Sequence, residues 1–330
     1  MVKQKAKIKG YMVIHSQSAR DKQALMALRI TAIGGGHGLG RVMSTLAFLE
    51  RRLVGIVATT DNGGATGMLR KHHQCIAWGD IRNCMSQLAN QPLAKEVLNY
   101  RFNSNSNLDG HNLGNLLLYT LDALSARPID GIQLLSRLLK VNNRILPMSE
   151  TPTDLLAELD NNLQCFGEIR IDELNSMPHR LSLSPNVSGT PEALKHLQRS
   201  DLIILGPGSF LTSVMPPLLV NDIAKAIYES PAKVIFIENL VPELSPAGAL
   251  TLMQKLDWLE QQLGFQPIDL AISNASSLHT DIPVISCVAS DQELIHRHNT
   301  DGLLAAIVQA AHYLLPHRDA EAVTDIHSLK

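Results

Sequence analysis

The feature that most constrains the fold is the segment 28–40, which reads LRITAIGGGHGLG. It begins with an apolar run containing β-branched residues, as is typical of a strand buried on both faces. Five glycines then fall within seven positions, and apolar residues recur at helical spacing from Val42 to Leu49. A strand, a glycine-rich turn and a helix in this order predict the first part of a βαβ nucleotide-binding unit. The glycines let a phosphate approach backbone N–H groups, and the helix N-terminus adds about +0.5 of a charge there.

The glycine-rich turn departs from two well-known phosphate-binding fingerprints. In the dinucleotide pattern G-x-G-x-x-G, the last position would be Leu39 or Arg41, neither of which is glycine. In the Walker A pattern, Lys-Ser/Thr should follow Gly40, where this chain has Arg41-Val42. We therefore predict a phosphate-binding loop of another class, the alternative being a tight turn without a ligand. The residues expected to contact the ligand are Gly34, Gly35, Gly36, His37 and Gly38.

Composition limits the class of protein. The chain has 330 residues, of which 45% are hydrophobic, enough for a sizeable core. Its 29 Lys and Arg against 31 Asp and Glu give a formal charge of -2, without the basic surplus of nucleic-acid or anionic-membrane binders. No apolar run reaches the roughly 18 residues that span a bilayer. We therefore expect a cytoplasmic protein that neither inserts into a membrane nor binds nucleic acid.

Cysteine and histidine spacing argues against a structural zinc site. The adjacent pair His72-His73 does not reproduce the spacing of zinc fingers or zincins, so a solvated or substrate-facing pair is favoured. The cysteines contain no C-x-x-C pair and are interpreted as reduced thiols of a cytosolic protein. The four positions are Cys75, Cys84, Cys165 and Cys287.

Polar residues also follow the second predicted strand, at 53–59. The carboxyl ends of parallel strands lie together where ligands bind, and this strand runs into TDNGGATG at 60–67. Asp61 stands where a Rossmann fold holds a ribose hydroxyl, and it can equally bind a metal ion; a plain Asp-Asn-Gly-Gly turn is the alternative. Asp80, the expected N-cap of the next helix, is the second candidate for a catalytic carboxylate. The other candidate ligand contacts are Asn62, Gly63 and Gly64.

A third polar group precedes the leucine-rich helix predicted at 116–124. It consists of His111, Asn112 and Asn115, which can either meet a ligand or cap the helix, and both readings stay open. The elements expected next are a helix at 129–139, strands at 141–148 and 154–161, an extended segment from Gly167 and a loop at 178–191.

The second glycine-rich site lies at 201–213, DLIILGPGSFLTS. Glycines again follow an apolar strand, and hydroxyl side chains suited to phosphate oxygens come next. A Pro-Gly turn without a ligand is the alternative. Pro216-Pro217 is expected to break the chain before a helix at 219–228. The candidate ligand contacts are Gly206, Pro207, Gly208, Ser209, Thr212 and Ser213.

These strand tips together predict an α/β fold, a Rossmann-like doubly wound and mostly parallel sheet with helices on both faces. Two further strands, at 234–237 and 270–272, end in small polar residues. Helices at 246–263 and 301–314 are expected to cover the sheet. The expected organisation is one nucleotide-binding domain at 28–330, preceded by a loosely ordered extension at 1–27.

Five ordered motifs resemble the gluconeogenesis factor family (YvcK/YbhK-like, UPF0052), within the 2-phospho-L-lactate transferase (CofD-like) superfamily. They are GGGHGLG at 34–40, TTDNGGATGMLR at 59–70, WGDIRNC at 78–84, GHNLGN at 110–115 and LGPGSFLTS at 205–213. The resemblance implies a CofD-like fold and a nucleoside diphosphate ligand, with Asn83 added to the site through the third motif. In this branch it implies a UDP-sugar such as UDP-N-acetylglucosamine. In the transferase branch it implies transfer of phospholactate to a deazaflavin alcohol with a divalent metal.

Two positions depart from the pattern of the resemblance. His37 stands where many relatives have threonine, and Asn62 stands where the transferase-like pattern has a second aspartate. A lone carboxylate at Asp61, the candidate Mg²⁺ ligand, is a weaker site for a hard cation than a pair. We therefore expect a UDP-sugar-binding regulator of carbon metabolism and cell-envelope morphogenesis, acting as a homodimer. The alternative is a phospholactate transferase with a nucleoside-diphosphate-activated donor, and a nicotinamide dehydrogenase is disfavoured.

Overall fold

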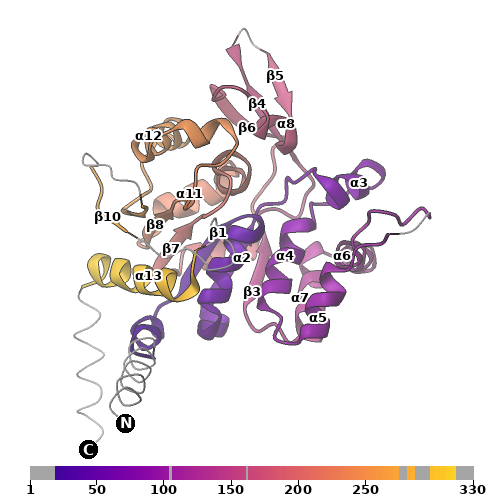
Figure 1. The fold of residues 1–330 in the computed structure, drawn as a ribbon, viewed down its shortest axis with the longest axis horizontal. Helices are drawn as coiled ribbons and strands as arrows, with labels where there is room; N and C mark the ends of the chain where they lie inside the picture. The colour runs from indigo at the N-terminus through magenta and orange to yellow at the C-terminus, as the bar shows by residue number, and fades with distance from the viewer. Residues whose placement is uncertain (1–18, 104–105, 161–162, 275–280, 287–297, 317–330) are drawn as a thin grey trace, which may run out of the picture.

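A seven-stranded parallel sheet forms the centre of the molecule (Figure 1). The computed structural model describes residues 19–103, 106–160, 163–274, 281–286 and 298–316. The strand order is β10-β9-β8-β7-β1-β2-β3, and every neighbouring pair is parallel, which confirms the predicted α/β class. The strands are β1 (Ile30–Gly34), β2 (Leu53–Val57), β3 (Arg144–Pro147), β7 (Leu202–Leu205), β8 (Lys233–Ile237), β9 (Leu270–Ile272) and β10 (Val284–Ile285).

The order of the strands creates a reversal beside β1. The chain places β2 and β3 on one side of β1, and β7 to β10 on the other. Strands β1, β2 and β7 are buried at every position, which is why their sequences are continuous apolar runs. In doubly wound sheets, ligands bind in the crevice that such a reversal opens at the carboxyl ends of the strands.

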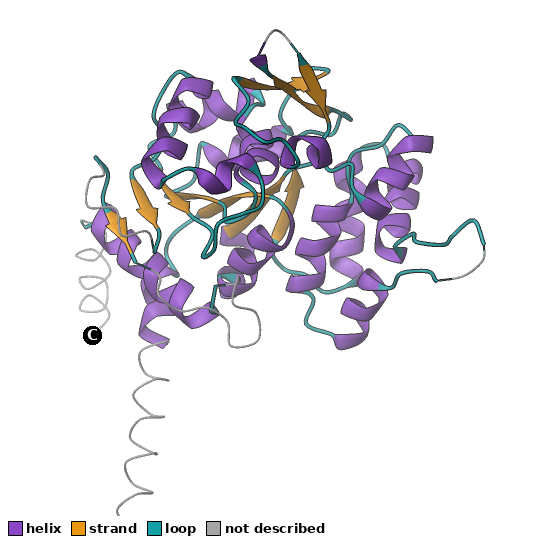
Figure 2. Cartoon of the chain, turned by 45° about the horizontal axis from the view of Figure 1, so that its top comes forward, coloured by secondary structure: helices purple, strands orange, loops and turns teal. Residues whose placement is uncertain are grey.

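Helices cover both faces of the sheet (Figure 2). Alternate residues of β1 point to opposite faces: Ile30 and Ala32 join one apolar cluster, and Ile33 joins the other. The first cluster is completed by α2 (Gly36–Thr45), α4 (Gly79–Leu88), α5 (Pro92–Asn99), α6 (Leu113–Leu124), α7 (Pro128–Leu138) and α13 (Thr300–Leu314). The second is completed by α9 (Pro191–Leu197), α10 (Met215–Leu218), α11 (Asn221–Glu229) and α12 (Leu252–Leu263).

A small antiparallel sheet stands at the top of Figure 1, where the sequence was expected to be partly irregular. Its strands are β4 (Asp154–Glu158), β5 (Gln164–Phe166) and β6 (Arg180–Ser184), and α8 (Glu168–Asp172) follows β5. The extended segment predicted from Gly167 is therefore wrong, because Gly167 adopts a φ of 88° and turns the chain into α8. The loop predicted at 178–191 is also wrong, since Leu181 and Leu183 alternate into the core as β6.

Prolines mark helix starts in two places where other structure was predicted. Pro216 and Pro217 lie within α10 and do not break the chain; in a first turn, the missing proline N–H has no partner to lose. The helix expected at 246–263 is divided, because Pro246–Ala249 forms a separate 3₁₀ turn. Helix α12 begins only after Thr251, which forms a capping box with Gln254.

The described part of the predicted N-terminal extension is helical at 19–25, and Leu25 is fully buried in the first apolar cluster. Residues 1–18 and Cys287 lie outside the described residues. Cys75 and Cys84 are buried free thiols, and Cys165 is a half-buried one. Among the described residues, no helix is long and apolar enough to cross a membrane.

Replacing Thr251 by alanine should lower the free energy of unfolding by about 1 kcal/mol. Thr251 Oγ1 accepts a hydrogen bond of 3.3 Å from the backbone N–H of Gln254, and alanine removes that acceptor. Urea unfolding followed by circular dichroism measures the change. Thr251→Ser is the matched control, because serine keeps the hydroxyl; an equal loss in both variants would contradict the capping account.

Candidate functional site

The two glycine-rich loops lie against each other at the carboxyl edge of the sheet. Strands β1 and β7 are direct neighbours, and the backbone N–H of Gly206 donates to the carbonyl of Ile33. A Cβ placed on Gly38 would lie 2.0 Å from the carbonyl oxygen of Pro207. Only glycine therefore permits this approach of the first turn of α2 to the second loop. Gly36 begins that turn with a φ of 56°, another requirement that glycine meets without strain.

A pocket of about 410 Å³ opens between the loops, a volume within the range of small-molecule sites. Asn239, at the end of β8, holds the second loop: its Oδ1 accepts from the N–H of Gly208 at 3.0 Å, and its Nδ2 donates to the carbonyl of Gly208 at 2.9 Å. The residues that line the pocket are His37, Gly38, Arg41, Pro207, Gly208, Asn239 and His298.

Sequence reasoning missed three of these lining residues: Arg41, Asn239 and His298. Arg41 lies three residues after Gly38, about one helical turn, a position from which a side chain can return to the loop. Asn239 follows a buried strand, a signal that the sequence did contain. His298 is only 4% exposed, and burial, with the neighbouring Arg41 charge, lowers its pKa to about 4. The imidazole is therefore neutral at pH 7, and nothing in the sequence around it indicated that it would reach this pocket.

Three carboxylates gather beside the first loop: Asp61, Asp80 and Glu168. Asp61 follows β2, and its Oδ1 accepts from the N–H of Gly63 at 2.7 Å. Burial and, secondarily, the charge of Asp61 raise the pKa of Asp80 to about 7. Burial, together with Asp61 and Asp80, raises the pKa of Glu168 well above its usual range. Near neutral pH, this cluster therefore carries protons that exposed carboxylates would have lost.

Asp80 connects the acidic cluster to the glycine loop. It lies inside the first turn of α4, whose N-cap is Trp78, so the prediction that Asp80 caps the helix is wrong. Its carboxylate accepts hydrogen bonds from the backbone N–H of Gly36 and from the side chain of Asn83. The small Gly79 lets the chain start this helix between Asp61 and Thr66, since a Cβ there would lie 2.9 Å from Asp61 Oδ2.

The short helix α8 contributes two acidic residues that sequence reasoning did not select, Glu168 and Asp172. They are four residues apart and therefore share a helix face. Thr60 Oγ1 donates to Glu168, and Asp172 accepts from Ser209 Oγ at 3.1 Å and Thr212 Oγ1 at 3.0 Å. Helix α8 thus contacts the residues after β2 and the loop after β7 together. Five residues are too few for a periodic signal, so this helix was not expected.

The hydroxyls of the second loop project from an unusual turn. Residues Phe210–Val214 form a π-helical turn, in which the N–H of Val214 bonds to the carbonyl of Ser209 at 3.0 Å. Ser209 and Thr212 are directed to Asp172, whereas the side chain of Ser213 lies beside Gly35 and Gly208. Of the three predicted hydroxyls, Ser213 is therefore the one placed between the two loops.

Asn62 acts as a link to α8. Its Oδ1 accepts from the N–H of Ile169 at 3.3 Å. A Cβ on Gly167 would lie 2.1 Å from Asn62 Nδ2, so Gly167 is needed for this packing. Gly63 and Gly64, which follow Asn62, form the N-cap and the first residue of α3 (Gly64–His72). The amide of Asn62 is thus engaged with the start of α8.

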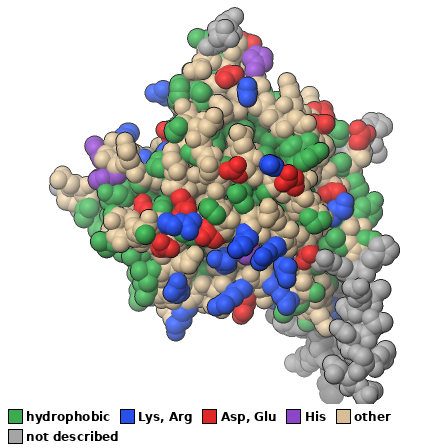
Figure 3. All heavy atoms as spheres, turned by 180° about the vertical axis from the view of Figure 1, so that it is seen from behind, with side chains coloured by type: hydrophobic (Ala, Val, Ile, Leu, Met, Phe, Trp, Pro, Cys, Tyr) green, Lys and Arg blue, Asp and Glu red, His purple; other side chains and the backbone are tan. Residues whose placement is uncertain are grey.

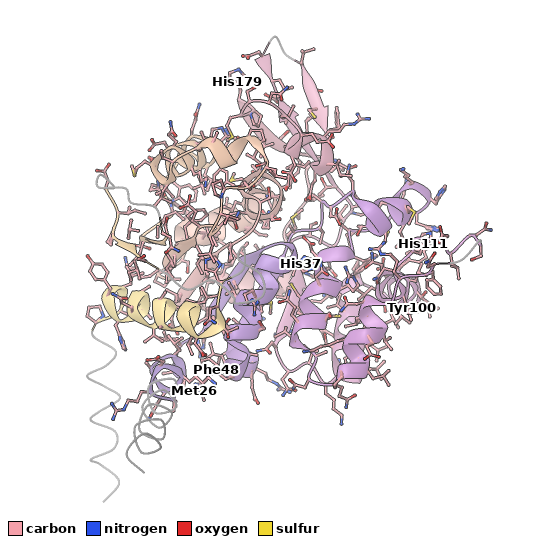
Figure 4. The ribbon with its side chains drawn as sticks, in the orientation of Figure 1. Met26, His37, Phe48, Tyr100, His111 and His179 are labelled. Atoms are coloured by element: carbon pink, nitrogen blue, oxygen red, sulfur yellow. The ribbon has the colours of Figure 1, made fainter. Side chains whose placement is uncertain are left out.

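The polar group before α6 has a structural role in the described chain. Asn112 is the N-cap of α6, since its Oδ1 accepts from the N–H of Asn115 at 3.2 Å. Asn115 Oδ1 accepts from Arg82 Nε at 3.1 Å. Both asparagines are buried, and His111 lies well apart from His37 (Figure 4). Of the two readings left open for Asn112 and Asn115, the contacts match helix capping.

The carboxylates beside the first loop have the right chemistry for a hard cation, but they are not close enough together to surround one. Carboxylate oxygens are the ligands that Mg²⁺ prefers. Among the described residues, however, no three His, Cys, Asp or Glu side chains are close enough together to hold a metal ion. The zinc alternative at His72-His73 gains no support, and His73 Nδ1 instead bonds to the hydroxyl of Tyr119 at 2.9 Å.

Comparison with known proteins places this geometry in a family. The model of the family described as "2-phospho-L-lactate transferase CofD" matches residues 30–309. The "Putative gluconeogenesis factor" of Pasteurella multocida is 45% identical over 284 residues, covering 84% of this chain and 92% of the relative. The "Gluconeogenesis factor" of Bacillus subtilis is 31% identical over 256 residues, covering 77% and 81%.

A solved structure agrees with the sequence matches. The crystal structure of a UPF0052 family member from Bacillus halodurans superposes with a TM-score of 0.78 at 28% identity. The match covers 84% of this chain and 98% of that one. The chain therefore belongs to the CofD family and, within that family, to the UPF0052 group of gluconeogenesis factors.

Proposed function

We propose that this protein binds a nucleoside diphosphate sugar of the UDP-sugar type where β1 and β7 meet. The observation that carries the proposal is the contact of Gly38 with the Pro207 carbonyl, beside a pocket of about 410 Å³. The names of the relatives, together with the resemblance of the motifs, support a regulatory role in carbon metabolism and in cell-envelope morphogenesis. The protein then acts by sensing the ligand.

The first loop supplies hydrogen-bond donors for the diphosphate. The N-cap of α2 is Gly35, which has no side chain to cap the first turn, and the N–H of Gly36 in that turn donates to the carboxylate of Asp80. Arg41 lines the same pocket and adds a positive charge within reach of the phosphates. Backbone donors, a helix N-terminus and one arginine suit a diphosphate that is bound without being cleaved.

A second pocket supports a ligand with two bulky ends. It measures about 440 Å³ and shares Asn239 with the first pocket. Its lining includes Thr251 and Asn274, two polar residues of the kind that bind a sugar or a base. Lys255 and Glu238 also line it, and Lys255 Nζ forms a buried ion pair of 2.7 Å with Glu238 Oε1. A nucleoside and a sugar joined by a diphosphate match this pair of adjoining pockets.

A UDP-sugar should stabilise the protein, whereas NAD and NADP should not. At about a hundred times its Kd, a ligand adds roughly 2.7 kcal/mol, which in a chain of this length raises the Tm by several degrees. Arg41→Gln should weaken binding about tenfold, because one charge-assisted contact is lost. Arg180→Gln, an exposed arginine of β6, is the control and should bind normally. A Tm shift with NAD and none with any uridine nucleotide would overturn the proposal.

Binding should tighten as the pH falls from 8 to 6. Burial and Asp61 raise the pKa of Asp80 to about 7, so acid neutralises a negative charge beside the bound phosphates. The diphosphate diester of a UDP-sugar does not titrate in this range, so the change belongs to the protein. We expect about a tenfold gain in affinity by calorimetry. Asp80→Asn should bind tightly at both pH values, while His37→Gln should keep the pH dependence; a pH dependence unchanged in Asp80→Asn would exclude this role of Asp80.

One observation favours a second candidate function, phospholactate transfer. The sequence offered Asp61 and, as a second candidate, Asp80; the charge of Asp61 acts on both Asp80 and Glu168, so a third carboxylate, Glu168, belongs to the same group. A divalent cation held by Asp61 and Asp80 together with ligand phosphates would neutralise charge on departing phosphate oxygens. Asp80, with a pKa near 7, is suited to accept the proton of an acceptor hydroxyl.

Turnover distinguishes the two candidates. Pure protein is incubated with Mg²⁺, the nucleoside-diphosphate-activated phospholactate donor and the deazaflavin acceptor, and product is followed by mass spectrometry. The sensing proposal expects less than one product per chain. Multiple turnovers that disappear in Asp61→Ala would instead establish the transferase. UDP-sugar binding measured on the same samples shows that the protein is folded and competent.

A further inference from the structure

A cluster of arginines lies at the edge of the sheet opposite the glycine loops. Because the strands are parallel, the starts of β1, β2, β3 and β7 all meet at this edge. Figure 3 shows blue side chains gathered in a band on this face, with a histidine among them. We call the group the amino-edge patch; it consists of Arg29, Arg51, Arg52, Arg137, Arg144, Arg199 and His196.

The amino-edge patch is hollowed. A recess of about 580 Å³ lies between α7 and the start of β3, and a second of about 210 Å³ lies beside the start of β1. Arg51 and His196 line both, so the two recesses adjoin. The larger recess is also lined by three neutral polar residues, Gln133, Ser136 and Asn142. Its charged and neutral residues thus line one recess that is open to solvent.

The protein neutralises this positive charge only in part, through Asp201, which accepts from the N–H of Arg29, and through Glu192, which lies near Arg144. Among the described residues, Arg51, Arg137 and Arg199 are within salt-bridge distance of no carboxylate. The nearby Glu150 and Glu192 both pair with Arg127, at 2.5 and 2.9 Å. In a chain with a net charge of -2, this is a local surplus that a bound anion would relieve.

The pKa of His196 responds to the positive charges of the amino-edge patch. Its Nε2 lies 3.0 Å from Arg144 Nη1, so the ring nitrogen accepts from the guanidinium. Burial is the main cause that lowers the pKa of His196, and the charges of Arg144, Arg199 and Arg29 lower it further, with Glu192 opposing them weakly. A multivalent anion in the recess would reverse the arginine contribution and favour the imidazolium.

We propose that the amino-edge patch binds a small metabolite carrying at least two phosphate groups on a hydroxylated body. Arginines match phosphates with paired donors, and the amides and hydroxyl match the hydroxyls between them. The recess volume suits a small molecule. The Glu150–Arg127–Glu192 group bounds the patch on one side, which disfavours a long polyanion. The patch is separate from the nucleotide site, because the two lie at opposite ends of the same strands.

The test is a calorimetric titration with two probes, a hexose bisphosphate and inorganic pyrophosphate. The wild type should bind one hexose bisphosphate per chain, also when it is saturated with a UDP-sugar. Arg51→Gln and Arg137→Gln should each weaken binding about tenfold or more, since each removes charge-assisted bonds, and Arg180→Gln should leave it unchanged. Affinity should fall as NaCl rises. Both substituted arginines are exposed, so thermal unfolding should match that of the wild type.

A nuclear magnetic resonance titration of His196 gives an independent readout. The pKa of His196 should rise when the bisphosphate binds, because the bound anion offsets the positive charges of Arg144, Arg199 and Arg29. Unchanged affinity in both Arg51→Gln and Arg137→Gln, or no binding of either probe at millimolar concentration, would overturn the proposal. A single-stranded RNA that binds the patch while the small probes do not would overturn it as well, in favour of a nucleic-acid surface.

Discussion

The close approach of Gly38 to the Pro207 carbonyl is the constraint on which the candidate site depends. It joins the first turn of α2 to the loop after β7, two segments about 170 residues apart in a chain of 330. The approach is possible because β1 and β7 are direct neighbours and end together. Asn239 then clamps the second loop with two hydrogen bonds to Gly208. The pocket, its arginine and its neutral histidine all take their positions from this contact.

The elements that could be predicted from the sequence were those with a local pattern of apolar residues and glycines. Buried strands such as β1 and β7 are continuous apolar runs, and glycines at their ends indicated where the chain turns toward a ligand. The parallel sheet follows from these strands alternating with helices. The boundaries failed where context overrode a local signal: Pro216 and Pro217 begin a helix, and Gly167 leads into one.

The residues that sequence reasoning missed share a different property. Glu168 and Asp172 lie on a five-residue helix next to the small sheet. His298 is near the C-terminal end of the sequence, far from the glycine loop that it reaches. No spacing rule brings them to β1 or β2, because their positions result from packing between distant segments. The same applies to Asp80, whose raised pKa comes from burial beside Asp61 and not from its own neighbours in sequence. The electrostatic character of the site is therefore a product of the tertiary fold.

The π-helical turn at Phe210–Val214 constrains the number of residues in this segment. Such a turn carries one residue more than an α-helical turn over the same path. Removing a residue would let the segment relax to an α-helix and would rotate Ser209 by about 100° relative to α10. Its hydroxyl would then turn away from Asp172, while α10 remained packed in the core. A single deletion would therefore disconnect the second loop from α8.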